Sequence, residues 1–353
     1  MLTTDIKKAI DTCVSLNIPF TVYSLPYSDT ISFFANPSSL EESKAYFDGR
    51  EEFIVNFFNN DYPYTIGIQP EMTAIELLEA SKNFKTKVSP EISPWTRDTG
   101  YLQYCSQAHQ IIQELKRTGG KTVLSRVITG EMIKKSSDII EEYFNCNPNA
   151  FCYAYMTRET GCWLGATPEI LYKYNFGDKY FETMSLAGTR LSSMHNEPWD
   201  YKNIEEHNYV TEYITKTLGG LGFDVSVGNE ETIQYGVIEH LCHRIKANFN
   251  GGNIVDLLNQ LSPTPAVAGY PLEYALEDIM NFEVHPRYCY AGYVGVANQN
   301  GLQIYVNIRC VHFNAKCFCV YGGGGLTEQS NEDDEWQEVE LKTSMLRKIL
   351  TNV

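Results

Sequence analysis

Cations are scarce in this chain of 353 residues. Lysine and arginine together number 28, against 44 aspartates and glutamates, and the formal net charge is −16. A surface with this excess of negative charge repels phosphate backbones and anionic lipid heads, so we expect no nucleic-acid partner and no membrane partner. A small anionic substrate is not excluded, because a few cations can dominate the field inside a pocket.

Long hydrophobic runs are also lacking. No stretch approaches the roughly 18 apolar residues of a membrane span. The first twenty residues have no apolar core of the kind found in a secretion signal, so we expect a cytoplasmic protein. The ten cysteines include no CxxC pair, and without a secretion signal we interpret them as free thiols rather than disulfides or metal ligands.

One short fragment, His240-Leu-Cys242-His243, contains three zinc-ligand side chains. If the fragment is a strand, His240 and Cys242 share one face while His243 points to the other. The three side chains then cannot converge on one ion, and we do not expect a zinc site here.

The chain is long enough for one large or two medium domains. Residues 1–95 carry weak patterns, so we treat them as an N-terminal part integrated into the same fold as a main domain over 96–353. Grouped strands with helices between them favour an α+β fold with a mostly antiparallel sheet. We predict strands at 121–128, 151–156, 170–174, 180–186, 237–249, 290–297, 302–313 and 317–321, and helices at 102–117, 201–218, 254–261 and 271–280.

The most informative segment lies near the C-terminus. Four consecutive glycines at 322–325 allow a backbone to approach a ligand closely. Ser330 is the predicted cap of the helix that follows. On that helix Glu335, Glu338 and Lys342 lie along one border of the apolar stripe. The carboxylates could hold a divalent cation, or they could be a solvated acidic face near the helix N-terminus.

Three other positions are of the same kind. Lys121 begins a strand behind two glycines, Glu169 lies in a tight turn before an apolar strand, and Glu206 is on the long helix. Taken singly, each is better explained as an ordinary surface or turn residue.

Taken in order, these segments resemble the chorismate-utilising enzymes, which include anthranilate, aminodeoxychorismate, salicylate and isochorismate synthases. The resemblance runs in family order over about residues 100–345 and implies an α+β fold of two stacked, mostly antiparallel sheets flanked by helices. It also implies that 96–353 is the chorismate-binding catalytic domain. The matching blocks are 121–126, 165–169, 186–190, 201–207, 240–241, 263–271, 290–292, 307–310, 321–326 and 335–342.

Within the family, Lys121 resembles isochorismate and salicylate synthases, whereas amine-transferring members have glutamine in this stretch. The loop 263–267 resembles the isochorismate synthase version. The resemblance therefore implies a Mg²⁺-dependent, reversible isomerase: water adds at C2 of chorismate and the C4 hydroxyl leaves. We expect it to serve menaquinone biosynthesis, with siderophore biosynthesis second, and to be a monomer. A salicylate synthase that also releases pyruvate, and a non-catalytic binding protein on the same fold, are the alternatives.

The resemblance also implies residue roles. Lys121 would be the base and Glu169 the acid, so the lysine has to give up its proton and the glutamate has to keep one, which burial favours for both. Glu206 and Glu338 would be the Mg²⁺ ligands, with Glu335 acting through water. The implied substrate-binding residues are Gly188, His240, Ala266, Tyr290, Arg309, Gly323 and Lys342.

One departure from the family pattern concerns the glycine run. The usual Ala-Gly-Ala-Gly-Ile is here Gly322-Gly-Gly-Gly-Leu326. The residues stay small, so we expect the carboxylate pocket to survive in a looser form.

Overall fold

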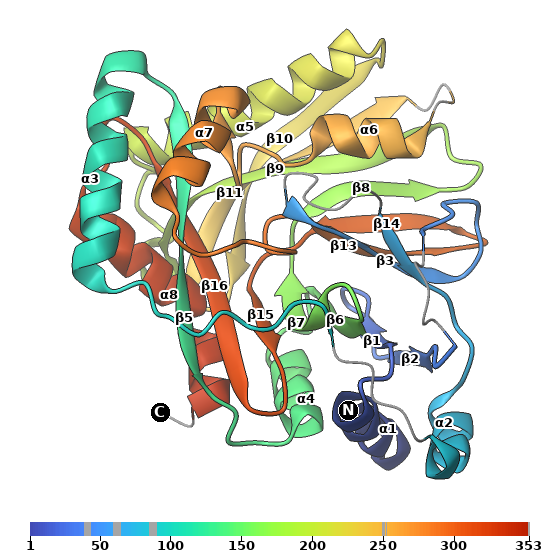
Figure 1. Ribbon diagram of the computed structural model, residues 1–353. Coiled ribbons are helices and arrows are strands. Elements are labelled where there is room, and N and C mark those ends of the chain that lie inside the picture. The colour runs from blue at the N-terminus through green and yellow to red at the C-terminus, as the bar shows by residue number, and fades with distance from the viewer. Residues whose placement is uncertain (39–43, 59–64, 85–89, 249–250, 252, 352–353) are drawn as a thin grey trace.

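Two eight-stranded sheets form the centre of the computed structural model, which describes residues 1–38, 44–58, 65–84, 90–248, 251 and 253–351 (Figure 1). All the strand pairs in the described residues are antiparallel. Sheet A has the order β12 (Gly269–Tyr270), β5 (Lys121–Glu131), β16 (Cys317–Leu326), β15 (Cys310–Phe313), β7 (Gly161–Thr167), β6 (Phe151–Thr157), β1 (Phe20–Ser24) and β2 (Ser32–Ala35). Sheet B has the order β10 (Val225–Tyr235), β11 (Ile238–Asn248), β9 (Tyr180–Leu191), β8 (Ile170–Asn175), β14 (Gly301–Val306), β13 (Tyr293–Asn298), β3 (Glu52–Asn56) and β4 (Ile66–Ile68).

The core between the sheets is rich in aromatic side chains. Phe151 of β6 stacks on Tyr305 of β14 with ring centroids 4.6 Å apart, and Phe53 of β3 lies 5.3 Å from Tyr155. Strand β6 is buried on both faces. Its aromatic side chains point into the core between the sheets, and the side chains that alternate with them point into a second core on the outer side of sheet A. The predicted α+β class with two stacked antiparallel sheets is confirmed.

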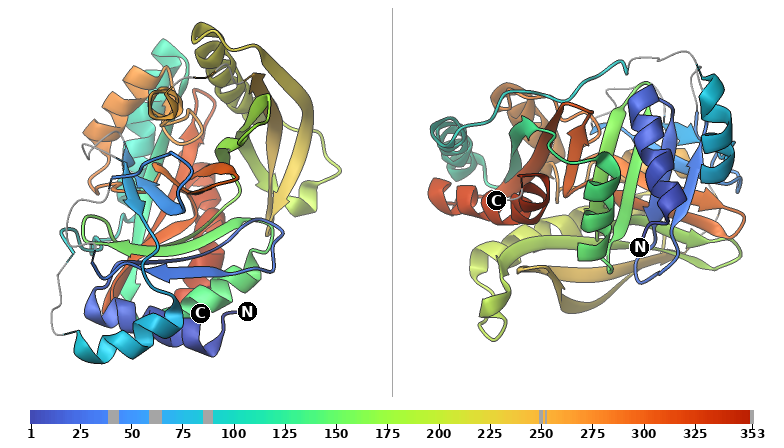
Figure 2. Two further views of the ribbon diagram at one scale, coloured as in Figure 1. Left: turned by 90° about the vertical axis from the view of Figure 1, so that its right-hand side faces the viewer. Right: turned by 90° about the horizontal axis from the view of Figure 1, so that it is seen from below.

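Helices cover the outer faces of the sheets. Helices α1 (Thr4–Leu16), α4 (Ser136–Cys146) and α8 (Glu332–Thr351) contribute to the second core, on the outer side of sheet A. Helix α5 (Tyr201–Gly220) packs on β9 and β11 of sheet B, near α6 (Ile254–Leu261). The other helical elements are α2 (Ala74–Ala80), η2 (Ser81–Asn83), α3 (Tyr101–Thr118), η3 (Ser192–Met194) and α7 (Leu272–Phe282). Figure 2 shows α1, α2 and α4 together on one side of the molecule. None of the helices in the described residues is both long and apolar enough to cross a membrane.

The N-terminal part contributes strands to both sheets. Strand β1 pairs with β6 in sheet A, and β3 pairs with β13 in sheet B. The boundary that we predict near residue 95 remains a prediction.

Most of the predicted elements are present. The four predicted helices correspond to α3, α5, α6 and α7. The predicted strand over 302–313 is wrong, because the chain leaves sheet B after Val306 and enters sheet A at Cys310. Arg309 adopts a φ of 52°, which no strand tolerates, and so ends the strand pattern there. After residue 96, strands β7, β10 and β12 were not predicted, and β16 continues through the glycine run to Leu326 instead of ending at 321.

Candidate active site

Four of the predicted site residues lie where the chain crosses between the two sheets or where a strand pairing is irregular. Glu169 lies between β7 of sheet A and β8 of sheet B, and Arg309 lies between β14 of sheet B and β15 of sheet A. Gly188, with a φ of 67°, lies at a shift in register between β9 and β11, opposite His240. These crossings bring residues distant in sequence to one place.

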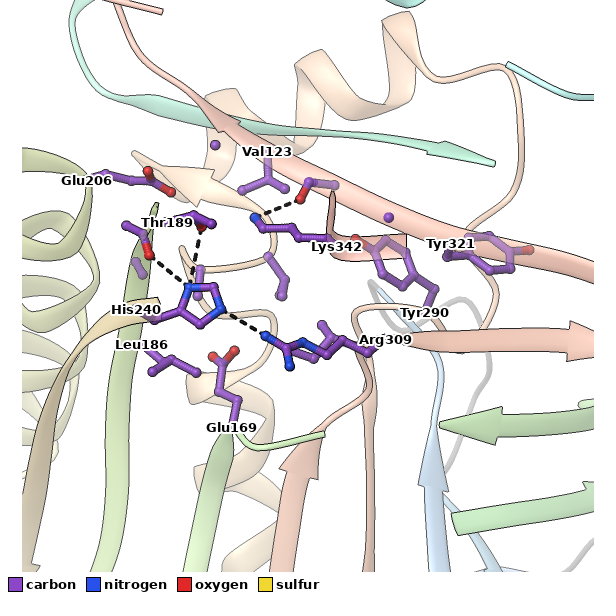
Figure 3. A pocket seen from close by; sticks show the side chains of 18 residues that line it. Val123, Glu169, Leu186, Thr189, Glu206, His240, Tyr290, Arg309, Tyr321 and Lys342 are labelled. Carbon is purple, nitrogen blue, oxygen red and sulfur yellow. Dashed lines mark hydrogen bonds between the residues drawn. The ribbon is translucent and has the colours of Figure 1, made fainter. Parts of the chain in front are cut away.

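One pocket collects nine of the twelve predicted residues (Figure 3). In the close view Glu169 points up toward His240 and Arg309, while Glu206 lies on another side of the pocket. The other three residues lie directly behind the lining, where Lys121 contacts Glu206 and the remaining two belong to α8. The nine lining residues are Glu169, Gly188, Glu206, His240, Ala266, Tyr290, Arg309, Gly323 and Lys342.

Lys121 begins β5 and its side chain is fully buried. Its Nζ lies 3.0 Å from Glu206 Oε1 but makes no well-directed hydrogen bond. Burial alone would raise the pKa of Glu206, but Lys121 and Lys202 outweigh it and the pKa is lowered. Glu206 is therefore an anion held against a buried lysine.

The pKa of Glu169 is shifted in the opposite direction from that of Glu206. Burial raises its pKa to about 8, although Lys121, Lys342 and Arg309 act in the other direction. Its backbone is fixed by a hydrogen bond from the Val306 amide to its carbonyl, 2.9 Å. The side chain is therefore a carboxylic acid at neutral pH, as a proton donor in the pocket has to be.

Three carboxylates and three lysines form a partly buried cluster between α5 and α8. Each carboxylate places one oxygen against one lysine, which limits how it can turn. The pairs are Lys121–Glu206 at 3.0 Å, Lys202–Glu335 at 2.7 Å and Lys342–Glu338 at 2.7 Å.

The remaining oxygens of this cluster fit a hard cation. Glu206 Oε2 and Glu335 Oε2 are buried and accept no hydrogen bond, and carboxylate oxygens are the ligands that Mg²⁺ prefers in proteins. Burial raises the pKa of Glu335 to about 7, against the effect of Lys202. Burial also acts to raise the pKa of Glu338, but Lys342 and Lys202 outweigh it and the pKa is lowered. Glu206 and Glu338 are thus the stronger candidates for direct ligands.

Two hydrogen bonds in series fix the orientation of the Arg309 side chain. Its Nη2 donates to His240 Nε2 at 2.9 Å, so His240 carries its proton on Nδ1 and donates it to the Gly188 carbonyl at 2.8 Å. Burial lowers the pKa of His240 to about 3, with Arg309 contributing. His240 is therefore a neutral residue that orients the guanidinium. Close by, Lys342 Nζ donates to the Gly323 carbonyl at 3.1 Å.

The glycine run is needed for close approach. A Cβ placed on Gly325 would lie 2.2 Å from Glu206 Oε1 and 2.6 Å from Lys121 Cε, and one on Gly323 would lie 2.8 Å from the Tyr290 hydroxyl. Strand β16 passes directly beneath these side chains, so a larger residue would displace them.

Sequence reasoning missed Lys202. The lysine stands four residues before Glu206 on α5, the spacing at which helical side chains meet, so the signal was present in block 201–207. The predicted cap of α8 is also wrong. Asn331 Oδ1 accepts from the amides of Asp333 and Asp334, while Ser330 Oγ donates to Glu335.

His240 and His243 point to different places, as the strand argument for 240–243 expects. His240 faces the pocket, whereas His243 lies with His207 and Glu230 on the side of α5. The three ligand atoms lie within 4.8 Å of one another. However, the two imidazole rings are stacked at 4.9 Å and 24°, so their lone pairs do not converge on a common point.

Comparisons with known proteins identify the family of this chain. A family model described as chorismate binding enzyme matches residues 65–351. Isochorismate synthase MenF of Escherichia coli (strain K12) is 28% identical over 267 residues, 72% of this chain and 61% of that protein. Isochorismate synthase EntC of the same strain is 27% identical over 241 residues, 64% of this chain and 61% of that protein. The chain thus spans about three fifths of the length of these relatives.

The fold is similar to a solved one. The structure of MenF, described as the menaquinone-specific isochorismate synthase from Escherichia coli, superimposes with a TM-score of 0.78 at 20% identity. The superposition covers 97% of this chain and 91% of the other. The two chains therefore share both sheets and their connections.

Proposed function

Because this chain belongs to the chorismate binding enzymes, we propose that it is an isochorismate synthase, an isomerase that converts chorismate reversibly to isochorismate. The family match confirms the resemblance seen in the sequence. The observation that carries the proposal is that Glu169, a glutamic acid whose pKa is about 8, lines the pocket and that a fully buried lysine, Lys121, lies directly behind the lining.

The reaction needs a base for the water that adds at C2 and an acid for the hydroxyl that leaves C4. Glu169 holds the proton that the leaving hydroxyl takes up. As the neutral amine, Lys121 would accept the proton of the attacking water, and its contact with Glu206 Oε1 at 3.0 Å fixes the position of its Nζ. Lys121 begins β5 of sheet A, whereas Glu169 lies at the crossing from β7 to β8, so the two residues reach the site from different elements and can act on different sides of a bound ring.

Glu206 and Glu338 would hold Mg²⁺, with Glu335 acting through water. When bound, the ion would offset the charge of the glutamates and hold the ring carboxylate of chorismate. The enolpyruvyl carboxylate would lie against Arg309 and Lys342, the cations that line the pocket. Arg309 suits a planar carboxylate because its guanidinium can donate two parallel hydrogen bonds.

The smaller contacts complete the substrate site. Tyr290 stacks on Tyr321 at 5.2 Å, which holds its ring at the wall near Gly323. Ala266 lines the same pocket and has no hydrogen-bonding side chain that could hold an intermediate for further reaction. We therefore expect the protein to release isochorismate and not to remove its enolpyruvyl arm.

Product analysis tests this function. Protein, chorismate and Mg²⁺ are incubated, products are separated by chromatography, and free pyruvate is measured with lactate dehydrogenase. We expect isochorismate in equilibrium with chorismate and little pyruvate. Stoichiometric pyruvate with salicylate at early times would make the protein a salicylate synthase. If chorismate is not consumed, the protein is instead a non-catalytic binding protein. Lys121→Met, similar in shape but uncharged, should lose turnover in the same assay.

We further propose that the isochorismate serves menaquinone biosynthesis. The support is the MenF similarity, although EntC is similar to nearly the same extent. Complementation decides: the gene should restore menaquinone to a strain that lacks its menaquinone-specific isochorismate synthase. Restoration of catechol siderophore alone would contradict this pathway.

A further inference from the structure

Lys202 occupies the middle of the carboxylate cluster. Its Nζ lies 2.7 Å from Glu335 Oε1 and 3.8 Å from Glu206 Oε2, and the side chain is 19% exposed. Glu206 is a candidate direct ligand for Mg²⁺, and Glu335 the candidate that acts through water. The ammonium of Lys202 therefore lies beside two of the carboxylates proposed to hold Mg²⁺.

The ammonium and a divalent ion would compete. Glu206 and Glu335 each keep one oxygen without a hydrogen-bond partner, and Lys202 approaches both side chains. Like charges a few ångströms apart in a buried site repel strongly, because little water is present to screen them. An ion bound to these oxygens and an ammonium in its present place would raise each other's free energy.

The side chain of Lys202 has space into which it can turn away from the carboxylates. A cavity of about 510 Å³ lies on the outer side of the cluster, between α5 and α8. Lys202, Glu335 and Glu338 line it together with the exposed Asp334. A lysine side chain has four rotatable carbons, so its head can turn outward while its stem stays in place. Asp334 offers an anionic partner there.

We propose that Lys202 is a counter-ion of the carboxylates at the metal site and that Mg²⁺ binds by displacing its ammonium into the α5–α8 cavity. This rests on the proposed Mg²⁺ site. Displacement lowers the affinity for the ion, so the metal site stays neutralised by the protein's own cation until Mg²⁺ reaches a sufficient concentration.

Isothermal titration calorimetry with Mg²⁺, without chorismate, tests the competition. Lys202→Met keeps the length of the side chain and removes its charge, so Mg²⁺ should bind at least tenfold more tightly than to the natural protein. Lys202→Arg keeps the charge and should not tighten binding. The matched control is Lys216→Met, which removes an exposed lysine paired with Glu212 on the same helix and should leave the affinity unchanged.

A second measurement needs no variant. An amine-acylating reagent and mass spectrometry report how accessible each lysine is. Adding Mg²⁺ should raise the labelling of Lys202 several-fold and leave the fully buried Lys121 unlabelled. Long-range repulsion alone would not change this labelling.

The outcomes are distinguishable. If the natural protein binds Mg²⁺ and Lys202→Met binds it equally or more weakly, the inference is overturned and Lys202 serves to hold Glu335. The inference is also overturned if labelling of Lys202 does not rise with Mg²⁺. If the natural protein binds no Mg²⁺, the metal site of the proposed function fails as well.

Discussion

Glu169 is a carboxyl group that its surroundings keep protonated. With a pKa of about 8, it loses its proton as the pH rises through that value, and an acid that has lost its proton cannot assist a leaving hydroxyl. We therefore expect kcat to fall above about pH 8. Glu169→Gln should lower kcat by roughly 10²–10⁴-fold, because it keeps the shape and loses the proton. Stopped assays across pH 6–10 measure both, and a natural enzyme whose kcat does not fall up to pH 10 would contradict the role.

The same shift links stability to pH. The pKa of Glu169 is higher in the folded protein, about 8, than its usual 4.5, so the folded state binds the proton more tightly. Its contribution to stability is complete below about pH 4.5 and is lost as the pH rises through 8. Denaturant unfolding at pH 5.5 and 8.5 should show a larger loss for the natural protein than for Glu169→Gln. Equal losses would mean that the carboxyl group is already ionised at the lower pH.

At the scale of elements, the site depends on how closely β16 approaches α5 and α8. A Cβ on Gly325 would meet Glu206 Oε1 at 2.2 Å, whereas one on Gly324 would meet Glu335 Oε2 at 3.1 Å. Gly325→Ala should therefore displace Glu206 and lower kcat/KM by at least tenfold. Gly324→Ala is the matched control on the same strand and should cost much less. Steady-state kinetics compares them, and equal losses would show that the strand has no such local constraint.

The proposed Mg²⁺ site needs two helices to meet. Glu206 lies on α5 and Glu338 on α8, so each proposed ligand depends on a separate element. Glu206→Gln and Glu338→Gln should each raise the Mg²⁺ concentration for half-maximal activity by at least tenfold, because a neutral amide binds Mg²⁺ weakly. EDTA should stop the natural enzyme and excess Mg²⁺ should restore it. Full activity in EDTA would remove the metal from the reaction.

How much was predictable varies by element. Helices α3, α5, α6 and α7 follow from apolar spacing and from end signals, which are local properties of the sequence. The break at Arg309 could not be foreseen, because its positive φ is imposed by the crossing between sheets and leaves no mark on the pattern 302–313. Most site residues were reached through resemblance. Lys202 was missed because a lysine beside carboxylates is ordinary on helix surfaces, and only packing against α8 buries it.

At the scale of the whole molecule, the two sheets share their strands with the N-terminal part. Strand β1 extends sheet A and β3 extends sheet B, so residues before 95 lie on both sides of the aromatic core. An N-terminal part built in this way has few means of unfolding alone. We propose on this basis that residues 1–95 and 96–353 form one cooperative unit.

A substitution at Phe53 tests whether the two parts unfold as one cooperative unit. It is fully buried and lies against Tyr155, Tyr153 and Phe151 of β6. Phe53→Ala should cost about 3–5 kcal/mol of unfolding free energy, the usual loss for a buried phenylalanine. If the chain is one unit, tryptophan fluorescence and far-ultraviolet circular dichroism should give coincident unfolding curves in denaturant, and the variant should shift both together. Tyr27→Ala, which removes an exposed ring of the same N-terminal part, should shift neither. Two separate transitions, with Phe53→Ala moving only the first, would instead make residues 1–95 an independent domain.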